Sequence, residues 1–377
     1  MTRRLTAAIG LLGWVGALGC AEAPEGPNVS RPSVIALQAS LSTSCALLSD
    51  GTLWCWGPGI GGVTAAPDFG PVQQPFTTAV SGFALGDMSL CAFTASQATY
   101  CWGLWFPIDG AVSYGDQPTV LTDTLSLRSL ASGMGHTCGV LTNAEVACWG
   151  SSLLGKRGLG FPDPTLGSTI PNKVIGAVGY AAVAVGRNHT CGLVQSGGLV
   201  TCWGEGVRLG DSSSVMQFSD TACFYQDVSC ALSPQLVSSL TGIHALAAGP
   251  EGTCALGAAV WCWGTFDAHL PRPTLVTLPA PGTQVTVGNM FGCALTATGN
   301  ASCWGRPGPW LGRSDSDPDP APVQTQLRFR LLAAGNEHTC GVATDDHVYC
   351  WGAPTFGPLG PGLDTSVTVP IRIRGPW

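Results

Sequence analysis

The sequence has 377 residues with a formal net charge of −7; only 10% are charged, and it contains 52 Gly, 28 Pro, 17 Cys and 13 Trp. A disordered chain would need low hydrophobicity, whereas 45% of these residues are hydrophobic. A helical protein is excluded because Gly is a poor helix former and Lys occurs only twice, so the composition indicates an all-β protein.

Residues 1–19 are predicted to be a signal peptide. Arg3 and Arg4 precede an apolar stretch over 5–18 that is too short to span a bilayer. The small residues before Cys20 resemble a bacterial lipoprotein signal, in which this cysteine becomes the lipidated first residue. The alternative is an ordinary secretory signal with an incidental cysteine. Both interpretations predict export, with a linker over 20–32, to the outer membrane or cell surface or otherwise to the periplasm or medium.

Fourteen of the remaining cysteines form seven pairs, each ending in Cys-Trp-Gly, and five of these pairs have nine intervening residues. An even set of cysteines at regular spacing in an oxidising compartment favours disulfides, because zinc ligands lie closer together in sequence. The last two cysteines are predicted to pair as well. The predicted disulfides are Cys45–Cys55, Cys91–Cys101, Cys138–Cys148, Cys191–Cys202, Cys223–Cys230, Cys254–Cys262, Cys293–Cys303 and Cys340–Cys350.

Each Cys-Trp-Gly pair flanks a predicted β-hairpin. In the first, Asp50-Gly51 is a hairpin turn signal, and Cys45 and Cys55 lie at equal distances from Asp50. The hairpin therefore places these cysteines opposite each other, and Trp56 points to the other face. Both faces carry apolar residues, as expected for a sheet packed between two neighbours.

The second cysteine recurs every 41 to 60 residues, a period typical of propeller blades. A Gly stands five residues before the first cysteine in six of the seven units, and Ser40 takes its place in the first. The full motif reads Gly-x-x-His-Thr-Cys-x-Leu-Thr, then Val-x-Cys-Trp-Gly, then Gly-x-Leu-Gly, and it resembles the regulator of chromosome condensation repeat. The resemblance covers residues 33–377 and implies a seven-bladed β-propeller with one hairpin disulfide per blade.

A strand of the Pro-x-x-Val type, such as 170–174, is predicted to begin each full unit. The first unit lacks this strand, and residues 367–373 at the end of the chain look like it. The sequence therefore predicts that the C-terminal strand completes the first blade and removes the open sheet edge.

The longest interval between successive repeats contains a predicted insertion at about 211–233, which the predicted Cys223–Cys230 disulfide constrains. Its aromatic residues Phe218, Phe224 and Tyr225 are candidates for a binding loop, and the alternative is an insertion without function. Trp105 and Trp310, in the segments after the second and sixth hairpins, are weaker candidates of the same kind.

Two patterns could suggest metal sites. His136, His189 and His338 occupy equivalent places in three of seven units, but residues spread around a ring cannot meet at one ion, so packed histidines are predicted. Residues 315–319 alternate like a calcium loop, but Pro320 and Gln326 stand where that loop needs Gly and Glu. A solvated acidic loop is predicted instead. We expect no metal, no cofactor and no catalytic residue.

The predicted function is a non-catalytic scaffold that binds a protein or glycan at the cell envelope, as a monomer attached to the membrane only through a lipid anchor. Nucleic-acid binding is disfavoured because the basic residues are scattered. One alternative is an enzyme inhibitor, since a secreted bacterial propeller of the resembled family inhibits β-lactamase. Another is an extracellular lyase or hydrolase. The nucleotide exchange activity of the family's eukaryotic founder is disfavoured, because this chain has an export signal and no basic surface.

Overall fold

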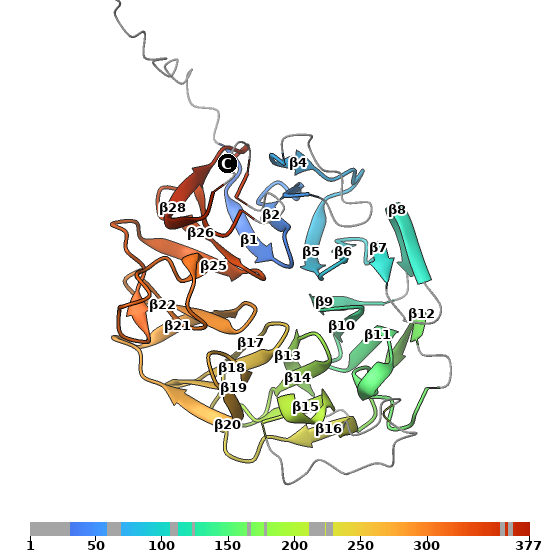
Figure 1. The fold of residues 1–377 in the computed structure, drawn as a ribbon. Helices are drawn as coiled ribbons and strands as arrows, with labels where there is room; N and C mark the ends of the chain where they lie inside the picture. The colour runs from blue at the N-terminus through green and yellow to red at the C-terminus, as the bar shows by residue number, and fades with distance from the viewer. Residues whose placement is uncertain are drawn as a thin grey trace, which may run out of the picture. The chain divides into compact units, whose positions relative to one another are not determined.

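The computed structural model describes residues 31–58, 69–105, 112–122, 125–163, 167–176, 179–210, 223, 229–354, 359–360 and 365–377. The unit Pro32–Trp377 contains seven antiparallel sheets of four strands each, and every sheet is made of four strands that are consecutive in sequence. The sheets follow one another around a ring in chain order, from blue to red in Figure 1. This arrangement confirms the predicted seven-bladed β-propeller.

The first four blades are formed by sixteen strands. They are β1 (Val34–Ala39), β2 (Ser44–Leu48), β3 (Leu53–Trp56) and β4 (Val72–Gln73); β5 (Val80–Leu85), β6 (Ser89–Thr94), β7 (Thr99–Trp105) and β8 (Val112–Thr122); β9 (Leu127–Ser132), β10 (His136–Leu141), β11 (Val146–Ser151) and β12 (Gly167–Lys173); and β13 (Tyr180–Val185), β14 (His189–Val194), β15 (Val200–Glu205) and β16 (Cys230–Leu236).

The last three blades contain twelve strands. They are β17 (Ala245–Ala248), β18 (Gly252–Leu256), β19 (Val260–Thr265) and β20 (His269–Val276); β21 (Gly282–Val287), β22 (Phe291–Thr296), β23 (Ala301–Gly305) and β24 (Ala321–Pro322); and β25 (Phe329–Ala334), β26 (His338–Ala343), β27 (Val348–Gly352) and β28 (Val367–Ile373). Three short 3₁₀ turns accompany them, η1 (Leu153–Gly155), η2 (Gly206–Arg208) and η3 (Pro309–Leu311). No helix in the described part of the chain has the length and hydrophobicity needed to cross a membrane.

The second and third strands of each blade form the predicted hairpin. The paired cysteines lie directly opposite each other in all seven hairpins, with Cα atoms 4.0 to 4.2 Å apart, and each pair is a disulfide. At the first turn, Asp50 Oδ1 accepts a hydrogen bond from the Thr52 amide over 2.9 Å. Cys223 and Cys230 form the eighth disulfide, with Cα atoms 6.0 Å apart.

The prediction about the C-terminal strand is wrong. β28 pairs with β27 in the seventh blade, and the first blade is complete with β1 to β4. The proline-containing strand is the fourth and outermost strand of its own blade rather than the start of the next, as shown by β12, which pairs with β11. Six of the seven outer strands contain a proline, which has no amide hydrogen and therefore blunts an exposed sheet edge.

The core lies between adjacent sheets. The tryptophans of the seven Cys-Trp-Gly triplets are buried, and each packs at a seam between two blades. The 3₁₀ turns cover three of them: the indole Nε1 atoms of Trp203, Trp263 and Trp351 donate to the carbonyls of Lys156, Arg208 and Trp310 over 2.9 to 3.0 Å. The loop that leaves one blade therefore covers the tryptophan of the next.

Candidate functional site

A ring of close backbone contacts surrounds the propeller axis. It contains one residue per blade, at the end of each first strand, and we call it the glycine ring. At each glycine of the ring, an added Cβ would lie within 2.7 Å of the carbonyl oxygen of the corresponding residue in the next blade. Glycine is required there because no side chain fits between the two backbones. The members are Ser40, Gly86, Gly133, Gly186, Gly249, Gly288 and Gly335.

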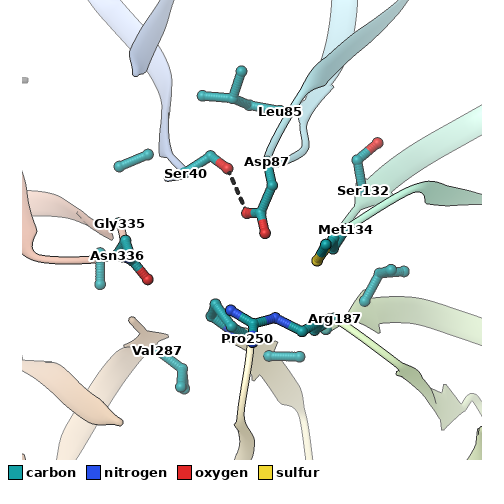
Figure 2. Close-up of a pocket in the computed structure, with 17 residues that line it drawn as sticks. Ser40, Leu85, Asp87, Ser132, Met134, Arg187, Pro250, Val287, Gly335 and Asn336 are labelled. Atoms are coloured by element: carbon teal, nitrogen blue, oxygen red, sulfur yellow. Dashed lines mark hydrogen bonds between the residues drawn. The ribbon is translucent and has the colours of Figure 1, made fainter. Parts of the chain in front are cut away.

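The residues that directly follow the glycine ring form the mouth of the axis. Backbone amides link them to the next blade: Asp87 donates to Gly133 over 3.3 Å, Arg187 to Pro250 over 3.3 Å, and Asn336 to Ser40 over 3.0 Å. They enclose a mouth cavity of about 60 Å³ lined by residues from all seven blades (Figure 2). A wider axial cavity of about 270 Å³ is lined by the inner strands.

Asp87 and Arg187 reach into the mouth cavity from opposite sides (Figure 2). Ser40 Oγ donates a hydrogen bond to Asp87 Oδ1 over 3.0 Å. Burial raises the pKa of the Asp87 carboxyl, although the Ser40 hydrogen bond and the charges of Arg187 and Lys156 act in the opposite direction. The cavity therefore holds a carboxylate that the protein itself solvates poorly.

A chain of ion pairs lies beside the mouth, between the fourth and fifth blades. Arg187 Nη1 contacts Glu251 Oε1 over 2.8 Å, Arg208 Nη1 contacts the second oxygen of Glu251, and Arg208 Nε contacts Glu205 Oε2 over 2.6 Å. Burial disfavours the charge of Arg208, but Glu205 and Glu251 raise its pKa overall. The two acids and two bases of this network balance each other.

Lys156 is buried behind the same mouth. Its Nζ donates to the carbonyls of Met134 and Arg187, over 3.1 and 3.4 Å. Burial lowers the pKa of Lys156 to about 8. These carbonyl bonds hold the ammonium group within the wall of the mouth cavity rather than in its centre.

The three repeated histidines are packed at the seams between blades, as predicted. Nε2 of His136, His189 and His338 lies 2.9, 2.7 and 2.9 Å from the hydroxyls of Thr190, Thr253 and Ser44 in the next blade. Burial lowers the pKa of His189 to about 3 and that of His338 to about 4, and it holds the pKa of His136 well below 6.5. These side chains are therefore neutral structural links at pH 7.

Exposed apolar side chains surround the mouth. The loops between first and second strands lie on this side of the ring, and so do the ends of the Cys-Trp-Gly strands, as the bond from the Glu205 amide to Asn188 shows (2.9 Å). We call this side the mouth face. Its exposed apolar residues include Leu41 and Met134, in loops between first and second strands, and Phe69 and Val207, in the segments that follow Cys-Trp-Gly strands. They are four of the twelve large apolar side chains that are exposed in the described chain.

The predicted binding loop can be followed only in part. Phe218, Phe224, Tyr225 and Cys20 lie outside the described residues, as does the Trp105 side chain, although Trp105 ends β7. The expectation that Trp310 is a contact residue is wrong, because only 8% of its surface is exposed. It lies in η3, where its indole donates to the Arg306 carbonyl over 3.0 Å and its own carbonyl accepts bonds from Thr339 and Trp351.

The acidic segment over 315–319 is a structured turn. Asp315 accepts a bond from the Gly308 amide over 3.1 Å, Asp317 from the Ser314 amide over 3.0 Å, and Asp319 pairs with Arg313 over 2.6 Å. The carboxylates are therefore bonded to the chain itself. No group of three or more His, Cys, Asp or Glu residues among the described residues could hold a metal ion.

Sequence reasoning missed the charged residues of the mouth. The position after each member of the glycine ring carries side chains of very different chemistry, from Leu41 and Met134 to Asp87 and Arg187. Its variability inside an otherwise regular repeat is the signal that could have marked it, because a position with a purely structural role would repeat like the glycine before it.

Comparisons with known proteins agree with this architecture. The model of the regulator of chromosome condensation (RCC1) repeat matches residues 34–57 and 329–357. The human E3 ubiquitin-protein ligase HERC2 is 27% identical over 85% of this chain, which spans only 7% of the length of HERC2.

Two solved structures are similar in fold. Prp20p from Saccharomyces cerevisiae has a TM-score of 0.71 and 21% identity, over 92% of this chain and 88% of that one. The ectodomain of the Arabidopsis thaliana receptor kinase ACR4 has a TM-score of 0.53 and 20% identity, over 88% of this chain and 99% of that one.

Proposed function

We propose that this chain, a seven-bladed propeller with RCC1 repeats, is a non-catalytic scaffold that binds a protein on its mouth face. The size of the mouth cavity carries this proposal. Pockets for small molecules have volumes of about 300 to 1,000 Å³, whereas the mouth cavity has about 60 Å³ and the axial cavity that shares part of its lining has about 270 Å³. The mouth cavity accommodates the end of one side chain, which favours a protein partner over the substrate of a lyase or hydrolase.

The surroundings of the cavity support a protein partner. Exposed apolar anchors beside a charged network are typical of protein interfaces, in which a few central residues contribute most of the affinity. Leu41, Phe69, Met134 and Val207 provide the anchors, and the paired acids and bases from Arg187 to Glu205 provide the charged groups. Prp20p has binding properties to Gsp1p and histones, so a propeller of this fold binds proteins. An enzyme inhibitor is one form of this function, in which the partner is an enzyme.

We further propose that the protein acts outside the cytoplasm, as a monomer anchored by a lipid on Cys20. All sixteen cysteines after Cys20 are placed as disulfides, which persist in oxidising compartments. The similar fold of a receptor ectodomain supports the same location. Metabolic labelling with an alkyne palmitate tests the anchor, since a Cys20→Ser variant should lose the label.

The test of the binding face is affinity capture from the native envelope with two matched double variants. Leu41→Asp/Met134→Asp alters the mouth face, and Ile170→Asp/Leu275→Asp alters exposed apolar residues of the outer strands β12 and β20. The first variant should lose the partner and the second should retain it. Capture that survives on the mouth variant but not on the outer-strand variant would contradict the proposal. Partner release by glycosidase treatment would favour a glycan instead.

A further inference from the structure

The mouth cavity contains an acid that no cation of the described chain contacts directly. The Asp87 carboxylate points toward the centre of the cavity, and its hydrogen bond from Ser40 Oγ over 3.0 Å comes from a neutral group (Figure 2). Asp87 forms no ion pair with any residue that the structure describes. A partly buried carboxylate with one neutral donor is far from fully solvated, since it can accept about four hydrogen bonds.

The neighbouring cations are occupied elsewhere. The guanidinium of Arg187 is paired with Glu251 over 2.8 Å, and the ammonium of Lys156 is bonded to two backbone carbonyls. The charges of Arg187 and Lys156 therefore favour the ionised Asp87 carboxylate at a distance, but neither cation contacts it directly. A ligand with a positive charge would supply the charged donor that Asp87 lacks.

A second acceptor lines the same cavity. Asn336 lines the mouth cavity, and its Oδ1 is buried without a hydrogen-bond partner in the described chain. Arg187 Nε is the one buried donor there that also lacks a partner among the described residues, so a carboxylate ligand is the competing possibility. That ligand would bring a second negative charge beside Asp87, which disfavours it.

From this geometry we infer that the mouth cavity binds the ammonium group of a lysine side chain that the protein partner inserts along the ring axis. Asp87 is the counter-ion and Asn336 the second acceptor. This inference rests on the proposed function and names the chemistry of its central contact. The volume fits this occupant, since about 60 Å³ holds a few water molecules or the tip of one side chain. A guanidinium, which is planar and broader, fits the narrow mouth less well.

The charge of Asp87 makes the contact dependent on pH. Burial raises the pKa of Asp87, and the groups that face it are Ser40, Arg187, Lys156 and, behind Arg187, Glu251. A bound ammonium favours the ionised carboxylate, so binding lowers this pKa and releases a proton. The affinity therefore falls as the pH decreases through the pKa of the free protein.

The test uses n-butylammonium chloride as a lysine-tip probe and the methyl resonance of Met134, which lines the cavity, as the signal. The folded wild-type protein should show a saturable shift that weakens at low pH. Asp87→Asn should weaken binding at least tenfold, because a charged hydrogen bond is worth about 1.5 to 3 kcal/mol. Asn336→Ala should weaken it about threefold to tenfold. Asp50→Asn, at a hairpin tip on the opposite face, is the matched control and should bind like the wild type.

Three results would overturn the inference. They are no saturable shift with n-butylammonium, equal shifts in the wild type and Asp87→Asn, or a saturable shift with butyrate that n-butylammonium does not compete. If Asp87→Asn does not fold, the inference is tested by the affinity of Asn336→Ala for n-butylammonium and by the pH dependence of binding to the wild type. The proposed function is tested separately. If Leu41→Asp/Met134→Asp loses the partner while Asp87→Asn retains full affinity, the mouth face is the binding face but the lysine contact with Asp87 is wrong.

Discussion

The seam between the seventh and first blades joins the two ends of the chain, whereas the seam between the fourth and fifth joins consecutive blades. Both use the same contacts. A histidine Nε2 reaches a hydroxyl of the next blade, His338 to Ser44 and His189 to Thr253, and the amide after the glycine ring donates to the next blade. The ring is therefore closed by the side chains and backbone bonds that join its other blades, without a strand shared between first and last.

The closing seam, between the seventh and first blades, also has contacts of its own. The Trp56 ring lies 5.5 Å from the Trp377 ring at the end of the chain, and Arg330 Nη1 donates to the Val34 carbonyl over 2.7 Å. The seam between the fourth and fifth blades is also held by the chain that runs through it, whereas no chain crosses the closing seam. The contact between Trp56 and Trp377 therefore distinguishes the closing seam, whereas the seam between the fourth and fifth blades has the ion pairs of Arg187 and Arg208 with Glu251.

Deletion of residues 365–377 should have the largest effect. It removes β28 and the Trp377 that packs on Trp56, and it exposes the edge of β27. We expect the melting temperature to fall by roughly 10 °C or more. Hydrogen exchange should show lost protection in β27. Loss of protection in β3 with β27 intact would instead support the sequence-based prediction that the C-terminal strand completes the first blade.

Gly335→Ala should have the next largest effect, because its Cβ would meet the backbone carbonyl of Ser40. The cost is about 3 kcal/mol or more, since a backbone atom cannot move aside. Gly133→Ala should cost a similar amount at an ordinary seam. Gly179→Ala is the control, because its Cβ would first meet the Gln195 side chain at 3.3 Å. Urea unfolding measures the stability of all three variants. If Gly335→Ala is tolerated while Gly133→Ala is destabilising, the closing seam is not equivalent to the other seams.

His338→Phe should have a smaller effect that changes sign with pH. Phe291 already occupies the equivalent place over Gly288, so the ring fits. At pH 7.5 the variant loses the bond to Ser44, worth about 1 kcal/mol. The pKa of folded His338 is lowered to about 4, so the wild type loses stability below pH 6.5 by about 1.4 kcal/mol per unit. At pH 5 the variant should therefore be the more stable protein by urea unfolding. A difference that does not change with pH would contradict a buried neutral histidine.

Much of the fold could be predicted because the same repeat occurs seven times in the sequence. The hairpins, the disulfides and the glycines follow from local spacing. The blade to which the proline strand belongs could not be predicted. This strand lies between two hairpins in sequence, and the sequence does not show with which hairpin the strand pairs. Trp310 was also misplaced, since only the folded loop brings η3 onto Trp351 of the next blade. Asp87 and Arg187 were missed because their opposition across the axis depends on ring closure.

Hydrogen exchange of the complex with the captured partner tests the binding face most directly. We predict protection of the loops that follow the glycine ring, at residues 86–89, 133–136, 186–189 and 335–338. The hairpin tips on the opposite face, such as 49–52 and 142–145, should exchange as in the free protein. Protection of these tips, with the mouth loops unchanged, would contradict binding of the partner on the mouth face.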